Sequence, residues 1–156
     1  MTPAVAALKR LKVPFELRRY TPSEDAESYG RDAADKLGAR YAQVGKTLVA
    51  EVDGALVVAI VPVSGSLDLK ALAGARGGKR ARMADAAEAE RATGYVVGGI
   101  SPLGHKRRLD VVIDRSLAAE ERVFVSAGRR GHQLELRAED LVRACGASLA
   151  DIARPQ

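Results

Sequence analysis

The lysine at position 46 is the residue whose type and surroundings most clearly suggest chemistry in this sequence. It lies in the run Gly45-Lys46-Thr47, which looks like the end of a phosphate-binding P-loop. That motif also requires a glycine at the position of Arg40 and a helix after the lysine, whereas the sequence continues as a strand. The sequence therefore excludes a P-loop.

The strand that carries Lys46 predicts which way its amine points. Side chains two apart on a strand share a face, so Lys46 lies on the face of Leu48, Ala50 and Val52, a row that looks core-facing. An ammonium on an apolar face costs free energy unless it opens onto a cleft or meets a partner. Two interpretations remain open: a functional amine in a cleft, or a strand-end lysine whose head reaches water.

A glycine-rich loop is the second candidate for chemistry, with the sequence Gly98-Gly99-Ile100-Ser101-Pro102-Leu103-Gly104. Its glycines carry no Cβ that would keep a ligand away from the backbone N–H groups, so such a loop suits an anion or an oxyanion. Lys106-Arg107-Arg108 follow directly and add positive charge. The combination predicts contact with a phosphate or a nucleotide, and an ordinary turn is the alternative.

The sequence offers no arrangement typical of a protein nucleophile or a metal site. No Gly-x-Ser-x-Gly elbow occurs, because Gly65-Ser66 lacks the flanking glycine. We interpret His105 and His132, both in basic loops, as exposed polar residues, and Cys145, near the end of an amphipathic helix, as a small core residue. Two histidines and one cysteine are too far apart to predict a metal site, and we expect no cofactor.

The charge balance indicates a polyanionic partner. The net charge is +5, and the basic residues cluster in five places. Each cluster taken alone is compatible with solvated surface, whereas together they predict a nucleic-acid-binding face. The clusters are Lys9 to Lys12, Arg18-Arg19, Arg76 to Arg82, Lys106 to Arg108 and Arg129-Arg130.

The length and composition predict one compact domain over residues 1–156. No apolar run approaches the ~20 residues that cross a bilayer, and no secretory signal is visible at the N-terminus. One cysteine excludes an internal disulfide. We therefore expect a cytoplasmic protein without a membrane partner.

Hydrophobic periodicity and capping residues predict a mixed α/β domain. Hairpin and helical connections both occur, so a purely parallel sheet is not expected. We expect helices over about 3–12, 29–37, 68–73, 85–91 and 139–145, and strands over 15–20, 44–52, 55–61, 80–83, 109–113, 122–126 and 133–137.

Several of these stretches together resemble a known family. They are Val44 to Leu48, Gly65 to Lys70, Thr93 to Gly104, Val125 to Gly131, the opening Met1 to Val5 and the closing Ala150 to Ala153. In this order they resemble the YbaK/EbsC proteins, which are free-standing relatives of the editing domain of bacterial prolyl-tRNA synthetases. The resemblance spans nearly the whole chain.

The resemblance implies a fold and an activity. The fold is a single mixed α/β domain with a central, partly barrel-like sheet surrounded by helices. The activity is trans-editing: removal of cysteine from mischarged Cys-tRNA(Pro), and from Cys-tRNA(Cys), by attack of the substrate thiol on its own ester. The implied partners are the acceptor end of a mischarged tRNA and a prolyl-tRNA synthetase in a ternary complex, and DNA is not expected.

The resemblance also assigns residues. Lys46 matches the essential lysine, Tyr29 stands where relatives often carry Phe, and Gln133 stands where they carry Asp. A neutral amide accepts a hydrogen bond but provides no charge pairing for a substrate ammonium. The remaining pocket positions are Tyr20, Thr47, Gly98, Gly99, Ser101 and Ser126, and the residues expected to hold tRNA phosphates are Arg80, Lys106, Arg107, Arg108, Arg129 and Arg130.

Two alternatives remain open at this point. One is a deacylase of the same fold that removes alanine or another small amino acid, in which water must attack the ester. The other is a non-catalytic module that binds aminoacyl-tRNA or a synthetase.

Overall fold

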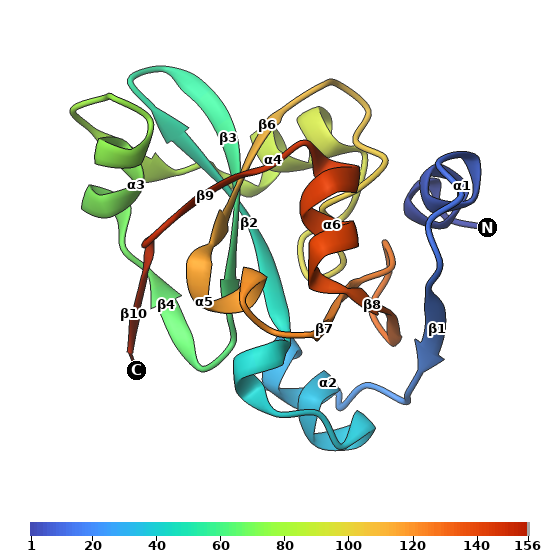
Figure 1. The fold of residues 1–156 in the computed structure, drawn as a ribbon. Helices are drawn as coiled ribbons and strands as arrows, with labels where there is room; N and C mark the ends of the chain where they lie inside the picture. Colours follow the sequence, from blue (N-terminus) through green and yellow to red (C-terminus); the bar gives the residue numbers. More distant parts are fainter. Residues whose placement is uncertain (156) are drawn as a thin grey trace.

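The computed structural model describes residues 1–155, which form three β-sheets and the helices around them (Figure 1). The helices are α1 (Pro3–Arg10), α2 (Tyr29–Leu37), the 3₁₀ helix η1 (Tyr41–Gln43), α3 (Leu69–Ala75), α4 (Ala86–Thr93), α5 (Arg115–Ala118) and α6 (Ala138–Cys145). The strands are β1 (Glu16–Arg19), β2 (Gly45–Val52), β3 (Ala55–Pro62), β4 (Gly65–Leu67), β5 (Ala81–Met83), β6 (Asp110–Asp114), β7 (Arg122–Ser126), β8 (His132–Arg137), β9 (Ser148–Ala150) and β10 (Ala153–Pro155).

The largest sheet is mixed and has the strand order β5-β2-β3-β6-β9. Its centre is the hairpin of β2 and β3, paired antiparallel from Gly45 opposite Pro62 to Val52 opposite Ala55. The Asp53-Gly54 turn has positive φ at both residues, as a two-residue hairpin of this twist requires. β6 adds parallel to β3 and β9 adds parallel to β6, so the expected mixed sheet is confirmed.

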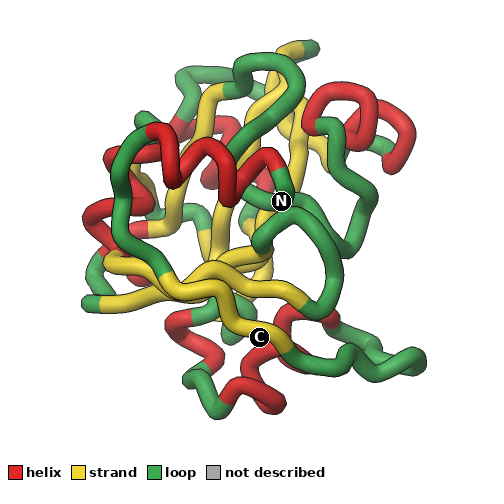
Figure 2. The backbone as a smooth tube through the Cα atoms, turned by 90° about the vertical axis from the view of Figure 1, so that its right-hand side faces the viewer, coloured by secondary structure: helices red, strands yellow, loops and turns green. Residues whose placement is uncertain are grey.

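A second, antiparallel sheet has the order β1-β8-β7 and lies beside the start of β2. An isolated parallel bridge between Val44 and Phe124 joins the two sheets at this point. Figure 2 shows the strands, in yellow, in the interior of the molecule with helices and loops around them, as expected. A separate ribbon pairs β4 with β10.

Both faces of the large sheet are buried. Successive β2 side chains point to opposite faces, and each face packs against an apolar core. Val49 packs into the larger apolar core together with residues of α1, α4 and α6. Ala50 and Val52 pack into a smaller core with Leu72 of α3 and with Ile152 near the C-terminus. The row that begins with Lys46 therefore faces a core, as predicted.

Most of the predicted elements are confirmed, and the capped helices most closely. Ser28 caps α2 through its hydroxyl, and Gly38 ends the helix in the left-handed conformation. The first helix ends at Arg10, two residues earlier than predicted. The sequence did not predict η1, β4, α5, β9 or β10. No helix in the described part of the chain is long and apolar enough to span a membrane.

Candidate active site

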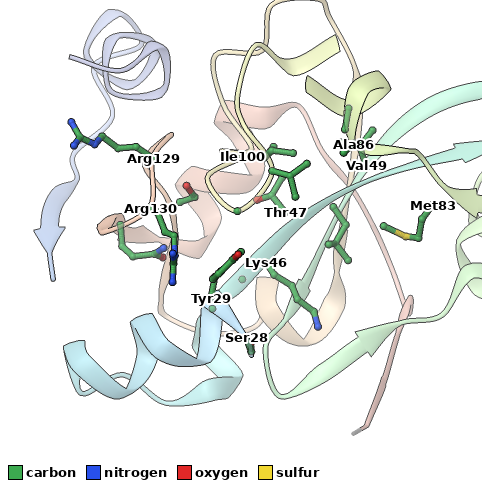
Figure 3. Close-up of a pocket in the computed structure, with 18 of the residues that line it drawn as sticks. Ser28, Tyr29, Lys46, Thr47, Val49, Met83, Ala86, Ile100, Arg129 and Arg130 are labelled. Carbon is green, nitrogen blue, oxygen red and sulfur yellow. The ribbon is translucent and has the colours of Figure 1, made fainter. Parts of the chain in front are cut away.

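A cavity of about 340 Å³ lies where β2, β5, α2, α4, the 98–104 loop and the β7–β8 hairpin meet (Figure 3). A volume of this order is at the lower end of the range for small-molecule sites. The cavity brings together nine of the residues that the sequence had suggested for the site or for tRNA contact. They are Tyr20, Tyr29, Lys46, Thr47, Gly98, Ser126, Arg129, Arg130 and Gln133.

Two of the suggested pocket residues lie outside the lining. Ser101 is fully buried; its Oγ accepts a hydrogen bond from the Leu103 backbone N–H at 3.4 Å. The backbone N–H of Gly99 donates to the Val96 carbonyl at 2.9 Å, so it is occupied within the loop itself. Both residues therefore shape the loop rather than face the cavity.

Lys46 is half-buried on β2, opposite Val61 of β3. Burial first, and then the charge of Arg31, lower the pKa of its ammonium. Among residues 1–155 the amine has no hydrogen bond or ion pair. Lys46 lines both the cavity and an adjacent polar hollow that contains Asp32 and Ser28. In Figure 3 the amine points away from Ile100 and Thr47.

Two other residues that line this cavity each have a buried oxygen atom without a partner. Thr47 Oγ1 and Gln133 Oε1 are buried, and neither has a hydrogen-bond partner within the described residues. Buried polar atoms are nearly always paired in native proteins, so unpaired ones in a cavity wall indicate positions for polar groups of a ligand. Gln133 Oε1 is an acceptor and the Thr47 hydroxyl both accepts and donates, so they suit an ammonium or a hydroxyl group.

Tyr29 and Arg130 form one side of the cavity mouth. The Arg130 guanidinium lies 4.1 Å from the centre of the Tyr29 ring and donates a hydrogen bond to the Ser23 carbonyl. Gly98 has φ of 97°, and a Cβ there would lie 2.8 Å from Tyr29 Cε2. A glycine is therefore required for the loop to approach the tyrosine ring this closely.

Two aromatic side chains hold the 98–104 loop in place, and this role was not predicted from the sequence. The Tyr95 hydroxyl donates to the Leu103 carbonyl at 2.6 Å, and His105 Nε2 lies 2.7 Å from the Ser101 carbonyl oxygen. Their rings meet edge to face at 6.3 Å. The interpretation of His105 and His132 as exposed residues was wrong, because both are half-buried. Burial lowers the pKa of His105, and its ring contacts the loop, whereas His132 begins β8 and its Nδ1 is buried.

Cys145 is confirmed as a core residue. Its thiol donates to the Pro102 carbonyl at 3.6 Å, and burial raises its pKa to about 12. Neither this cysteine nor a histidine lines the cavity. Ser126 does line it, and its hydroxyl accepts from the Gly128 N–H at 3.1 Å. No histidine is available in the lining to activate a serine.

The cations expected to hold tRNA share one property: none of them lies within 4.0 Å of a carboxylate in the described chain. Arg129 and Arg130 lie at the cavity. Arg80 lines a separate hollow beside Lys79, and Lys106 to Arg108 follow α4, where the Lys106 and Arg107 backbones hydrogen-bond to the end of that helix. By contrast, Arg18 and Arg122 both pair with Glu135.

Comparison with known proteins gives concordant results. Residues 23–144 match the family model of the aminoacyl-tRNA editing domain. EbsC of Enterococcus faecalis, which carries the name of a Cys-tRNA(Pro)/Cys-tRNA(Cys) deacylase, is 34% identical over 152 residues, covering 97% of this chain and 92% of EbsC. ProXp-y of Escherichia coli, named a multifunctional Ser/Thr-tRNA deacylase, is 31% identical over 122 residues, covering 75% of this chain and 73% of ProXp-y.

The fold is shared with solved structures as well. A crystal structure described as that of a trans-editing enzyme for prolyl-tRNA synthetase superposes with a TM-score of 0.86 at 24% identity, over 97% of this chain and 95% of the other. At this identity the likeness concerns the fold alone. It confirms the architecture that the resemblance in the sequence implied.

Proposed function

The chain belongs to the aminoacyl-tRNA editing domain family, and we propose that it is a trans-editing deacylase acting on Cys-tRNA(Pro) and Cys-tRNA(Cys). One observation carries the proposal: Lys46, whose half-buried amine has no partner among residues 1–155, lines the same cavity as two residues whose buried acceptor oxygens also lack partners there, and no cysteine or histidine lines that cavity. Such a site binds and polarises a reactive ester without supplying a nucleophile.

Lys46 acts by stabilising charge. When the ester carbonyl is attacked, negative charge develops on its oxygen, and a protonated amine already held in a partly desolvated cavity stabilises that charge without reorganising water. The long, flexible lysine stem lets the amine approach the carbonyl from the side opposite the 98–104 loop. The free energy spent on desolvating the lysine in the resting protein is recovered in the transition state.

The substrate supplies the nucleophile. The thiol sulfur of the cysteinyl group attacks its own carbonyl carbon, a sulfur–carbon bond forms, and the ester bond to the ribose oxygen breaks. The thiol proton passes to the departing ribose oxygen, which leaves as a hydroxyl group. The products are cysteine thiolactone and uncharged tRNA, with no change in oxidation state.

Thr47 Oγ1 and Gln133 Oε1 fit the α-ammonium of the aminoacyl group, since both are acceptors. The same acceptors suit a side-chain hydroxyl, and the relative ProXp-y is named for Ser/Thr-tRNA. Deacylation of seryl- or threonyl-tRNA by attack of water is therefore a second candidate function.

The tRNA is held through its phosphates. Arg129 and Arg130 at the cavity, and Arg80 and Lys106 to Arg108 elsewhere, have no carboxylate partner in the described chain and are available to phosphate oxygens. Phosphate contacts carry no sequence information, so a bound prolyl-tRNA synthetase would select the tRNA. We place this complex of the protein, the synthetase and the tRNA in the cytoplasm.

The test is a deacylation panel with purified protein and charged tRNA(Pro). Cys-tRNA(Pro) should be released fastest, with thiolactone as the product. Ser-tRNA(Pro) and Ala-tRNA(Pro) replace the thiol by a hydroxyl and by hydrogen, and equally fast release from them would contradict the thiol-driven route. If every ester is as stable with the protein as in buffer, the protein is instead a non-catalytic module that binds aminoacyl-tRNA or a synthetase.

A further inference from the structure

We propose that a second cavity, next to the candidate active site, binds the phosphate of a nucleotide that precedes the acylated 3′ end of the tRNA. This cavity, here called the α1–β1 cleft, has a volume of about 270 Å³ and lies between α1, β1 and the β7–β8 loop. Lys9, Arg19 and Arg129 line it. The proposal rests on the proposed function, because it assigns the same tRNA to both cavities.

The charge of the cleft favours an anion. Its lining contains three cationic side chains and no carboxylate, and none of the three cations lies within 4.0 Å of a carboxylate among residues 1–155. Elsewhere the chain pairs many of its arginines with acids, as Arg18 and Arg122 are paired with Glu135. Cations left without acids around a concave surface are the arrangement that phosphate oxygens neutralise.

The apolar part of the lining favours a nucleotide over a free phosphate. Val5 of α1, Leu17 of β1 and Ala127 form this part, and Leu17 is 37% exposed. An apolar wall beside cations gives the flat face of a base a surface to lie on while its phosphate meets the charges. A cavity of this size has room for a single-stranded nucleotide and not for a double helix.

The β7–β8 hairpin places the two cavities on its opposite faces. Successive side chains on a strand alternate, so His132 lines the cleft and Gln133 lines the active site. Arg19 lies opposite His132 in the β1–β8 ladder and therefore shares its face. The Nδ1 atom of His132 is buried and has no hydrogen-bond partner in the part of the chain that the structure describes.

Arg129, in the loop of this hairpin, connects the two cavities, because it lines both. In Figure 3 its side chain points away from Lys46, whereas Arg130 lies beside Tyr29. Figure 1 shows α1 and β1 together at one edge of the molecule, and β1 pairs with β8, the strand that follows this loop. A strand that leaves the active site across the loop thus meets Arg129 first and then Arg19 and Lys9.

The experiment compares two RNAs that differ only at the 3′ end: uncharged tRNA(Pro) and the same tRNA lacking its three terminal nucleotides. The variant Lys9→Gln/Arg19→Gln should bind intact tRNA about tenfold more weakly than wild type. The slope of log Kd against log salt should fall by about 0.7 for each lost phosphate contact to a single strand. The trimmed tRNA should bind equally to both proteins.

The matched control is Arg10→Gln/Lys12→Gln, which removes the same charge from exposed positions beside the cleft that do not line it. This control should keep the wild-type difference between intact and trimmed tRNA. Equal losses on both RNAs with Lys9→Gln/Arg19→Gln, or no loss on either, would overturn the proposal. This binding experiment uses uncharged tRNA, so its result does not depend on deacylation. If the wild-type protein fails to deacylate charged tRNA, that failure overturns the proposed function alone.

Discussion

Gln133 on β8 lies directly opposite Ser126 on β7, and both residues line the candidate active site. Gln133 is only 7% exposed, yet its Oε1 has no hydrogen-bond partner within residues 1–155. A side chain on an antiparallel ladder is held in a fixed direction by the strands on both sides. The backbone pairing therefore places the Gln133 side chain on the same face as Ser126, where the active site lies.

Gln133→Asp should strengthen the binding of an aminoacyl ammonium. A charged acceptor forms hydrogen bonds roughly twice as strong as a neutral one, so KM for Cys-tRNA(Pro) should fall about fivefold while kcat changes little. The buried carboxylate should also lower the free energy of unfolding by about 1–2 kcal/mol in urea titrations. Steady-state kinetics check the first effect. A KM that stays constant in Gln133→Asp and in Gln133→Met would show that the ammonium is held elsewhere.

Lys46→Ala should abolish catalysis and spare binding. Removing one donor that stabilises an oxyanion typically lowers kcat by about 100- to 1000-fold. The affinity for uncharged tRNA(Pro) should change less than about twofold, because the phosphates are held by other cations. Single-turnover deacylation and filter binding measure the two quantities. Wild-type turnover by Lys46→Ala would remove this lysine from the mechanism.

The lowered pKa of Lys46 predicts how activity depends on pH. The protonated amine is the form that stabilises an oxyanion, and it is lost as the pH rises through its lowered pKa. The rate of Cys-tRNA(Pro) deacylation, divided by the spontaneous rate, should therefore decline at a pH below the ordinary pKa of a lysine. Lys46→Arg keeps its charge throughout, so its profile should lack this decline. Identical alkaline limbs in both proteins would show that a group other than Lys46 causes the decline.

Asp114 should be important for stability rather than for catalysis. Its buried carboxylate accepts hydrogen bonds from the backbone N–H groups of Ile152 and Ala153, at 2.8 and 2.9 Å. Asp114→Ala leaves these donors unpaired and should lower the free energy of unfolding by about 3 kcal/mol. Asp110→Ala is the control: it removes one exposed pair with Arg76 and should cost under about 1 kcal/mol. Urea unfolding measures both, and equal losses would contradict this role of Asp114.

The elements that the sequence predicted best are those whose signals are local. Ser28 and Gly38 mark both ends of α2, and the Asp53-Gly54 turn fixes the β2–β3 hairpin within a few residues of itself. The strands β4, β9 and β10 have three residues each and pair only with distant segments. Three residues show no periodicity, and their partners are invisible until the chain has folded.

Some residues of the candidate site were also predicted correctly from the sequence, and others were not. Lys46 and Gly98 follow from residue type and from the resemblance, and both line the cavity. The exposure of a side chain depends on segments that pack over it from elsewhere in the chain. For this reason Ser101, inside a recognisable motif, is buried away from the cavity, and His105, in a basic loop, was misread as exposed.

The bridge between Val44 and Phe124 has a consequence for motion. One edge of β2, the strand that carries Lys46, pairs with β3, and Val44, two positions before Lys46, is bridged to Phe124 of β7 in the other sheet. Local fraying at either sheet alone leaves the lysine backbone anchored by the other. Amide hydrogens around this junction should exchange with solvent only through global unfolding. The loops around the site can therefore open locally while the backbone of Lys46 keeps its position.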